Sequence, residues 1–102
     1  MAYIHKKKKS YRNRQLEMKR KERMKVYNSQ KWRSLRDWKL TSDPLCEMCI
    51  KHGKTTPTEE IHHITSFMTT DDPIKRTHLA YNYENLMSLC QVCHQKIHNN
   101  NK

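Results

Sequence analysis

Large apolar side chains recur three residues apart in the second quarter of the chain. Trp32, Leu35 and Trp38 form one apolar stripe on a helix that the spacing predicts over residues 29–39. Asp43-Pro44 ends this helix, because the residue before a proline is pushed out of the α region. We expect both tryptophans to pack in the core rather than to stack on bases.

The residues before this helix are mostly polar and basic. Isolated apolar positions such as Leu16 and Met24 lie among cations, so a helix in this segment has no continuous apolar face to bury. We therefore predict a basic N-terminal arm over residues 1–27, helical in part, and a domain over residues 28–102.

The pattern after the helix changes from polar to alternating. Residues 51–54 contain the only glycine and predict a turn, and residues 59–64 predict a strand. Residues 65–80 are rich in Thr and Asp and contain Pro, which predicts a loop. Apolar alternation at 86–89 predicts a second strand, and residues 91–99, without Gly or Pro, predict a final helix.

The length and composition of the chain limit how it can be stabilised. The 102 residues, of which 34% are hydrophobic, fit one domain with a modest core. A source of stability besides apolar burial is therefore expected. No apolar run approaches the roughly 18 residues that a bilayer requires, and no apolar signal segment precedes the domain. We expect an intracellular protein with no membrane-spanning role.

The positive charge is concentrated in the predicted arm. Residues 1–27 carry eleven Lys and Arg against two Glu, a net charge of +9, whereas residues 28–102 carry ten against eight, a net charge of +2. Such an arm suits a polyanion, because each phosphate that it neutralises releases condensed counterions. A solvated tail that keeps the protein soluble is the alternative. The candidate nucleic-acid-binding residues are Lys6, Lys7, Lys8, Lys9, Arg12, Arg14, Lys19, Arg20, Lys21 and Arg23.

The four cysteines form two pairs with the spacing of zinc knuckles, Cys46/Cys49 and Cys90/Cys93. Disulfides are the competing interpretation, which a reducing compartment disfavours. Four thiolates would complete a tetrahedral structural zinc site with no position open for water. His52 is an alternative ligand, but we expect both His52 and His78 to be ordinary surface histidines.

Five further residues surround the second cysteine pair. His94 and His98 are four apart and would share a helix face, a spacing that can hold one metal ion. In a strand, the adjacent His62 and His63 would point to opposite sides, so one can face a metal while the other faces a substrate. Asn85 directly precedes the second predicted strand.

Taken in order, these residues resemble the HNH nuclease pattern. The run Ile61-His-His-Ile64, the run Asn85 to Cys90, and Cys93-His94 with His98 are similar to the small HNH endonucleases of tailed phages over about residues 27–98. The resemblance implies a small α+β fold. Its centre would be a ββα-metal unit, a hairpin plus a helix, which helices precede and a four-Cys zinc knuckle stabilises.

The resemblance also implies roles for these residues. His63 would be the general base, and His62, His94 and His98 would hold a catalytic divalent ion. Asn85 would hydrogen-bond backbone across the hairpin loop and so orient the base. The chain has His62 where many phage relatives have Asp, as DNase colicins do, which tilts the metal preference towards Zn, Ni, Co or Mn and away from Mg. Gln95-Lys-Ile-His98 also departs from the phage pattern, which often continues with a basic residue and threonine.

The function expected from the sequence is metal-dependent hydrolysis of DNA phosphodiester bonds, as a nick or a double-strand break. The resemblance extends to proteins that act with a phage terminase large subunit in genome packaging. If it is phage-encoded, the protein would lie in the host cytoplasm. Two alternatives stay open at this stage: a zinc-ribbon DNA-binding module without catalysis, and a zinc-stabilised adaptor. The zinc-ribbon module leaves His62, His63, Asn85, His94 and His98 without a role, whereas an adaptor role need not exclude cleavage.

Overall fold

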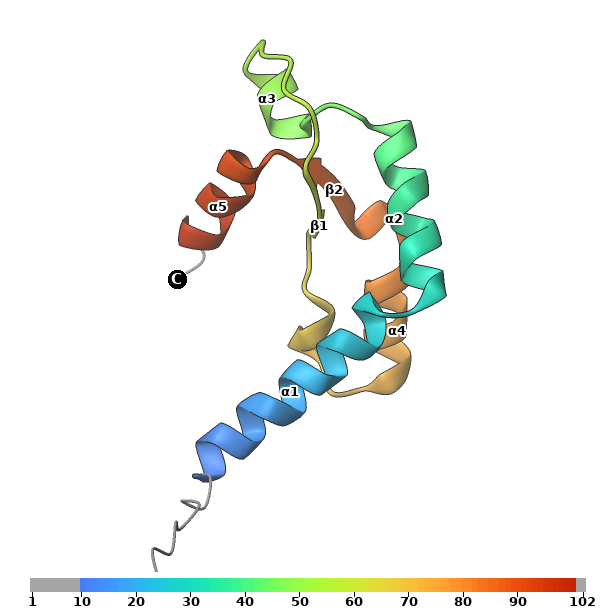
Figure 1. The fold of residues 1–102 in the computed structure, drawn as a ribbon, viewed down its shortest axis with the longest axis vertical. Coiled ribbons are helices and arrows are strands. Elements are labelled where there is room, and N and C mark those ends of the chain that lie inside the picture. The colour runs from blue at the N-terminus through green and yellow to red at the C-terminus, as the bar shows by residue number, and fades with distance from the viewer. Residues whose placement is uncertain (1–9, 101–102) are drawn as a thin grey trace, which may run out of the picture.

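The computed structural model describes residues 10–100, in which helices surround one short hairpin (Figure 1). In chain order the elements are α1 (Tyr11–Tyr27), α2 (Gln30–Ser42), α3 (Glu47–Lys51), β1 (Glu60–His63), the 3₁₀ helix η1 (Phe67–Thr69), α4 (Pro73–Tyr81), the 3₁₀ helix η2 (Tyr83–Asn85), β2 (Leu86–Leu89) and α5 (Gln91–Asn100). The small α+β fold expected from the sequence is confirmed.

Side-chain caps fix where the longer helices begin. Ser10 Oγ accepts a hydrogen bond from the Asn13 amide at the start of α1, and Ser29 Oγ accepts one from the Trp32 amide at the start of α2. These contacts satisfy amide groups that the first helical turn leaves unpaired. At the other end of α2, Asp43 is the C-cap, three to four residues beyond the predicted end of the helix.

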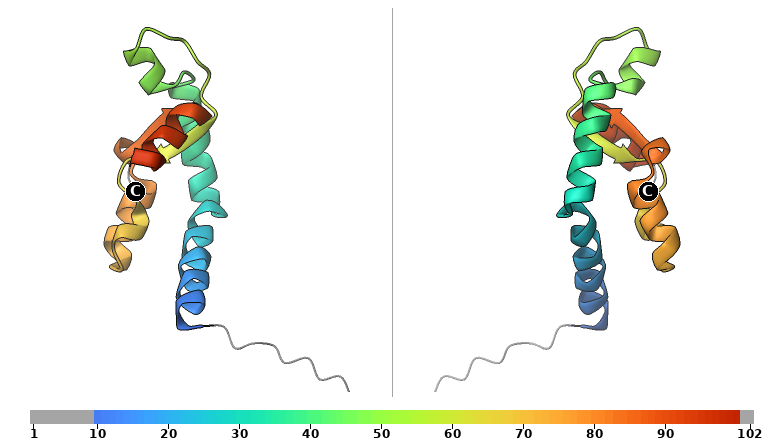
Figure 2. Two further views of the ribbon diagram at one scale, coloured as in Figure 1. Left: turned by 90° about the vertical axis from the view of Figure 1, so that its left-hand side faces the viewer. Right: turned by 90° about the vertical axis from the view of Figure 1, so that its right-hand side faces the viewer.

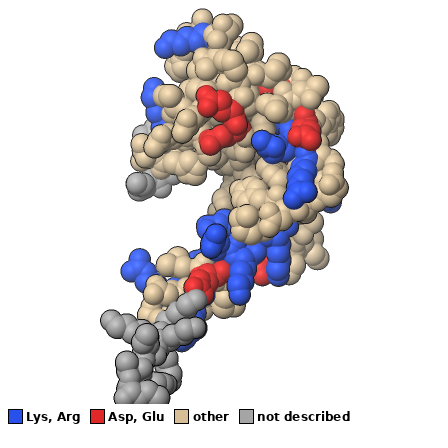
Figure 3. Space-filling model, in the orientation of Figure 1, with Lys and Arg blue, Asp and Glu red and all other residues tan. Residues whose placement is uncertain are grey.

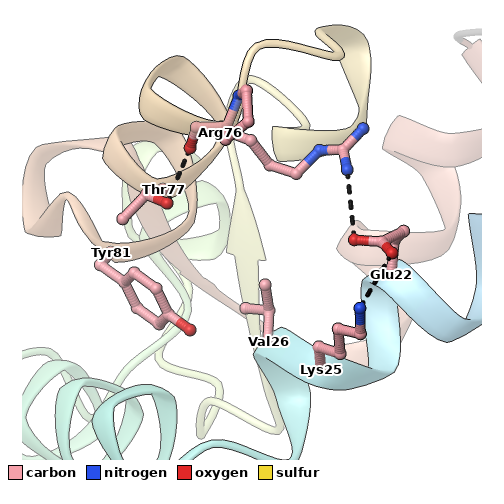
Figure 4. Close-up of a pocket in the computed structure, with 7 residues that line it drawn as sticks. Glu22, Lys25, Val26, Arg76, Thr77 and Tyr81 are labelled. Atoms are coloured by element: carbon pink, nitrogen blue, oxygen red, sulfur yellow. Dashed lines mark hydrogen bonds and ion pairs between the residues drawn. The ribbon is translucent and has the colours of Figure 1, made fainter.

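Helices α1 and α2 form a long column beside the rest of the molecule (Figure 2). Of the seventeen residues of α1, only Val26 is buried, so most of this helix extends into solvent. Its last turns pack against α4 around a cavity of about 230 Å³ (Figure 4), where Arg76 pairs with Glu22 at 3.5 Å. The polar pattern of residues 11–27 is thus reflected in a helix docked mainly through its C-terminal end.

The hairpin is antiparallel and short. Glu60 lies opposite Leu89, and His63 lies opposite Leu86. The connection between the strands contains η1, α4 and η2, and α5 follows β2 directly. A hairpin with a helix at its end is the ββα arrangement expected from the sequence.

Two predictions about local structure were wrong. Residues 65–80 are not a loop, because Asp72 caps and Pro73 begins helix α4, with the Asp72 carboxylate accepting from the Ile74 amide at 2.9 Å. Proline is favoured in the first turn of a helix, where its missing N–H costs nothing. Trp38 is not in the core either: it is 59% exposed and packs its ring against Tyr83, with centroids 4.4 Å apart.

Two apolar clusters stabilise the fold. One gathers Val26, Trp32, Phe67, Ala80 and Leu86 where α1, α2, η1, α4 and β2 meet. The other consists of Cys46, Cys49, Leu89 and Cys90, with the partly buried Cys93 packed against it. Near the second cluster, the buried Lys39 ammonium lies 2.7 Å from the Asp43 carboxylate and 3.3 Å from that of Glu47.

Among residues 10–100, no helix is long and apolar enough to cross a membrane.

Candidate active site and metal centres

The four cysteines converge at the junction of α3 and α5. Cys46 and Cys49 come from the start of α3, Cys90 directly precedes α5, and Cys93 lies in its first turn. Their sulfurs lie within 4.8 Å of one another, and all four are free thiols. The Cys49 sulfur is 3.8 Å from that of Cys90 and 3.7 Å from that of Cys93. The competing disulfide interpretation is therefore wrong.

These distances suit a zinc ion. Zinc–sulfur bonds of about 2.3 Å in a tetrahedron separate the sulfurs by about 3.8 Å. Burial would raise the pKa of the Cys46 thiol, but backbone N–H groups of Cys90 and Cys49 donate to its sulfur and lower the pKa to about 7. Backbone donors that stabilise a thiolate are what a structural zinc site needs. A zinc ion bound here would hold α3 against the start of α5.

Three histidines form a second cluster, centred on the face of α5 that looks towards β1. The ligand nitrogens of His62, His94 and His98 lie within 4.8 Å of one another. The two Nε2 atoms of His94 and His98 are 3.0 Å apart. Nitrogens bound at about 2.0–2.1 Å to one ion are separated by about 2.9–3.4 Å, so this pair has the separation of metal ligands.

The protonation of this cluster also favours a bound cation. Burial, together with the nearby rings of His94, His98 and His63, lowers the pKa of His62 to about 4. The ring is therefore neutral at physiological pH and offers a lone pair. Imidazole nitrogens that converge in this way suit a shared divalent ion.

Glu60 is a functional residue that the sequence reasoning missed. Its carboxylate contacts Nδ1 of His94. A carboxylate that accepts from one imidazole nitrogen leaves the other nitrogen with its lone pair, and so fixes the tautomer in which Nε2 binds metal. Its position two residues before His62 on β1 is the signal, because residues i and i+2 of a strand lie on the same face.

His63 lies on the other face of β1 from His62. Its ring is 7% exposed, stacks on Trp32 with centroids 4.7 Å apart, and meets Phe67 edge to face. His63 Nε2 lies 3.0 Å from the carbonyl oxygen of Ala80. Because a carbonyl only accepts, Nε2 carries the proton and Nδ1 carries the lone pair. Burial lowers the pKa of His63, and the bond to Ala80 opposes this shift in part.

Asn85 ties the connection between the strands to β2. Its Nδ2 donates to the carbonyls of Leu79 at 2.8 Å and Thr65 at 2.9 Å, and its Oδ1 accepts from the Thr65 amide at 2.9 Å. The backbone carbonyl of Asn85 also accepts from the Ile64 amide at 2.8 Å. These contacts fix the backbone that directly follows His63, and also Leu79, the residue before Ala80.

One cavity brings His63 together with the histidine cluster. It has a volume of about 170 Å³ and is lined by Tyr27, Ile61, His62, His63, Ser66, Phe67, His94 and His98. Its lining comes from the end of α1, from β1, from the region of η1 and from α5. In the space-filling view the surface is hollowed above α1 (Figure 3). The residues predicted as base and as metal ligands therefore share a single solvent-accessible pocket.

The other residues singled out in the sequence lie apart from this pocket. His52 and His78 are exposed, as expected. The basic residues Arg12, Arg14, Lys19, Arg20, Lys21 and Arg23 lie on α1, and Lys6, Lys7, Lys8 and Lys9 lie outside the described residues.

The hairpin, the following helix and the two metal-ligand clusters define the class of ββα-metal proteins. Comparison with protein families matches residues 46–100 to the family described as HNH endonuclease. This match spans more than half of the chain, which belongs to the HNH endonuclease family.

One solved structure is similar to this protein over most of both chains. It is the HNH endonuclease of the deep-sea thermophilic bacteriophage GVE2, crystallised with manganese ion. The two chains are 30% identical with a TM-score of 0.70, and the similarity covers 83% of this chain and 87% of that one. Comparison with curated proteins gave no match.

Proposed function

We propose that this protein is a metal-dependent DNA endonuclease that hydrolyses phosphodiester bonds. The observation that carries the proposal is the shared pocket, in which a histidine oriented by a backbone carbonyl lies beside three histidines whose nitrogens converge. A nuclease of this type needs both a base for the attacking water and a site for a divalent ion.

His62, His94 and His98 would hold the catalytic ion. When bound, a divalent ion stabilises negative charge on the phosphoryl oxygen and on the departing 3′ oxygen. Glu60 would keep His94 in the metal-binding tautomer through its contact with Nδ1.

His63 would act on the water. The Nε2–H group donates a hydrogen bond to the carbonyl oxygen of Ala80, so Nδ1 is the basic atom of the ring. Nδ1 would take a proton from the water that attacks phosphorus. The phosphorus–3′ oxygen bond then breaks and the departing 3′ oxygen takes a proton from solvent, which leaves 5′-phosphate and 3′-hydroxyl ends. Asn85 would support this step from a distance, because its hydrogen bonds hold the backbone that orients His63.

The three imidazole ligands favour some divalent ions over others. Three imidazoles are softer ligands than carboxylates and water, so we expect activity with Mn, Ni, Co or Zn to exceed activity with Mg. The GVE2 endonuclease, crystallised with manganese, supports a manganese-competent site.

Two alternatives have less support. A zinc-ribbon DNA-binding or adaptor module would need the cysteines and the basic helix, but not a second cluster whose His94 is oriented by a carboxylate. Partnership with a terminase large subunit is an expectation from the family resemblance alone. Co-purification with a terminase large subunit would test it.

Plasmid digestion tests the proposal. Protein stripped of its weakly held ion by mild chelation should be inactive on supercoiled plasmid and should recover with Mn, Ni or Co, while the tightly held zinc is retained. His94→Ala should stay inactive with every ion, whereas His78→Ala, an exposed histidine outside the pocket, should cut normally. Open-circular or linear product distinguishes nicking from double-strand cleavage. No cleavage by wild type with any ion would contradict the proposal.

A further inference from the structure

A line of arginines on α1 leads along the helix to the pocket. Arg12, Leu16, Arg20, Arg23 and Tyr27 are spaced four, four, three and four residues apart, which places them on one helix face. Tyr27, at the end of this face, lines the same cavity as the four histidines. The three arginines are exposed.

The face is distinct from the one that packs on the domain. Glu22, Lys25 and Val26 face the cavity between α1 and α4 (Figure 4), and Val26 enters the core. On the helix, the mean direction of the arginine line lies about 80° from Val26, about 120° from Glu22 and about 180° from Lys25. The three arginines are exposed, so they are not needed to attach α1 to the domain.

Tyr27 connects the line to the chemistry. Its ring meets Trp32 and Phe67 edge to face, with centroids 5.5 and 5.6 Å away, and lies 6.2 Å from that of His63. Burial raises the pKa of the Tyr27 hydroxyl, and the charge of Arg23 opposes this rise, so the guanidinium acts on that hydroxyl. Among residues 10–100 the hydroxyl has no hydrogen-bond partner and is available to a ligand.

We propose that Arg12, Arg20, Arg23 and Tyr27 form a track that binds the sugar–phosphate backbone of the DNA strand beside the bond that is cut. This inference rests on the proposed function and specifies which face of the basic arm meets the substrate. From Arg12 to Tyr27 the track is about 22 Å long. One strand carries a phosphate every 3.4 Å or so of duplex axis, so this length spans about six phosphates and accommodates separate contacts by each arginine.

A specific track and a non-specific attraction by net charge predict different results for two variants that lose the same charge. Arg20→Gln/Arg23→Gln removes two charges from the track, and Lys21→Gln/Lys25→Gln removes two from other faces of the same helix. All four side chains are exposed, and the lysine variant loses only the exposed pair of Lys25 with Glu22, which is worth about 1 kcal/mol or less. Both double variants should therefore fold and retain zinc.

Binding to a short fluorescent duplex of arbitrary sequence is measured across a salt series, without the catalytic divalent ion. The slope of log affinity against log salt should fall by about 1.8 in the arginine variant, since each lost phosphate contact removes about 0.9. The slope of the lysine variant should stay at the wild-type value. Equal changes in the two variants, or no change in the arginine variant, would overturn the track.

Tyr27→Phe tests the end of the track without altering charge. Loss of one hydrogen bond to a phosphate oxygen should weaken binding about 2- to 12-fold while leaving the salt slope unchanged. Unchanged affinity would exclude the Tyr27 hydroxyl from the track. Because binding is measured without cleavage, wild-type protein that binds through the track but never cuts would contradict the proposed function alone. Protein that cuts but loses binding equally in both double variants would contradict the track alone.

Discussion

The carboxylate of Glu60 on β1 contacts Nδ1 of His94 on α5, while Nε2 of the same imidazole faces Nε2 of His98 at 3.0 Å. The strand and the helix are thereby joined through one ring. One nitrogen of that ring is held by the protein and the other is directed towards its neighbours in the histidine cluster.

Replacing the carboxylate of Glu60 should weaken the binding of the catalytic ion. Glu60→Gln should lower the affinity for Mn about 10- to 100-fold, because an amide holds the His94 ring and its tautomer less well. The measurement is cleavage rate against Mn concentration, in which the curve shifts to higher Mn with zinc content unchanged. Glu59→Gln is the matched control, since Glu59 is exposed and adjacent. An unshifted curve for Glu60→Gln would contradict the assigned role.

Removing the Asn85 amide should loosen the connection between the strands. Asn85→Ala leaves the carbonyls of Leu79 and Thr65 without their side-chain donor, which should lower the free energy of unfolding by about 1–3 kcal/mol. Denaturant unfolding of the zinc-loaded protein measures this loss. Asn99→Ala, at an exposed position of α5, should change stability by less than about 0.5 kcal/mol. Equal stability of the two variants would show that the Asn85 contacts contribute little.

The cysteine site should decide whether the domain folds. Cys49→Ser should lose zinc and cooperative unfolding, because structural zinc supplies folding free energy to a small domain. Zinc content and thermal melting measure both effects. His52→Ala should keep zinc and the wild-type melting temperature, since His52 is exposed near the cluster and four sulfurs already converge there. A Cys49→Ser protein that keeps its zinc would refute the four-cysteine site.

Removing the arm should separate DNA binding from folding. Deletion of residues 1–25 keeps Val26 and Tyr27 but removes the Glu22–Arg76 ion pair, a partly exposed contact worth about 1 kcal/mol or less. The zinc site should survive, while DNA affinity falls and its dependence on salt flattens, equally for unrelated sequences. Unchanged affinity and slope would mean that the arm does not bind DNA, and docking to another protein would explain it better.

The order of elements near the metal sites could be predicted from sequence because short-range rules fix it. CxxC spacing, period-2 alternation in β1 and β2, and the i, i+4 pair His94 and His98 each depend only on local geometry. Helix α4 was missed because Asp72-Pro73 is compatible both with a turn and with a capped helix start.

The contacts between distant elements could not be predicted in the same way. Helical spacing put Trp32 and Trp38 on one stripe, but a spacing of three residues drifts by about 60° per step, so Trp38 lies about 120° around α2 from Trp32. Lys39, not Trp38, takes the buried position on that turn. The contact between Glu60 and His94 depends on how α5 leaves β2, which no local pattern encodes. Burial of His63 against Trp32 depends likewise on the packing of α2 over the hairpin.

The role of His63 is tested by single-turnover plasmid cleavage with His63→Gln. Glutamine is preferred to alanine because the ring is buried against Trp32, where truncation would leave a void, and because its amide can still donate to Ala80. If His63 deprotonates the attacking water, cleavage should fall about 10²- to 10⁴-fold with zinc content and Mn affinity unchanged. Cleavage at the wild-type rate would show that His63 is not the base.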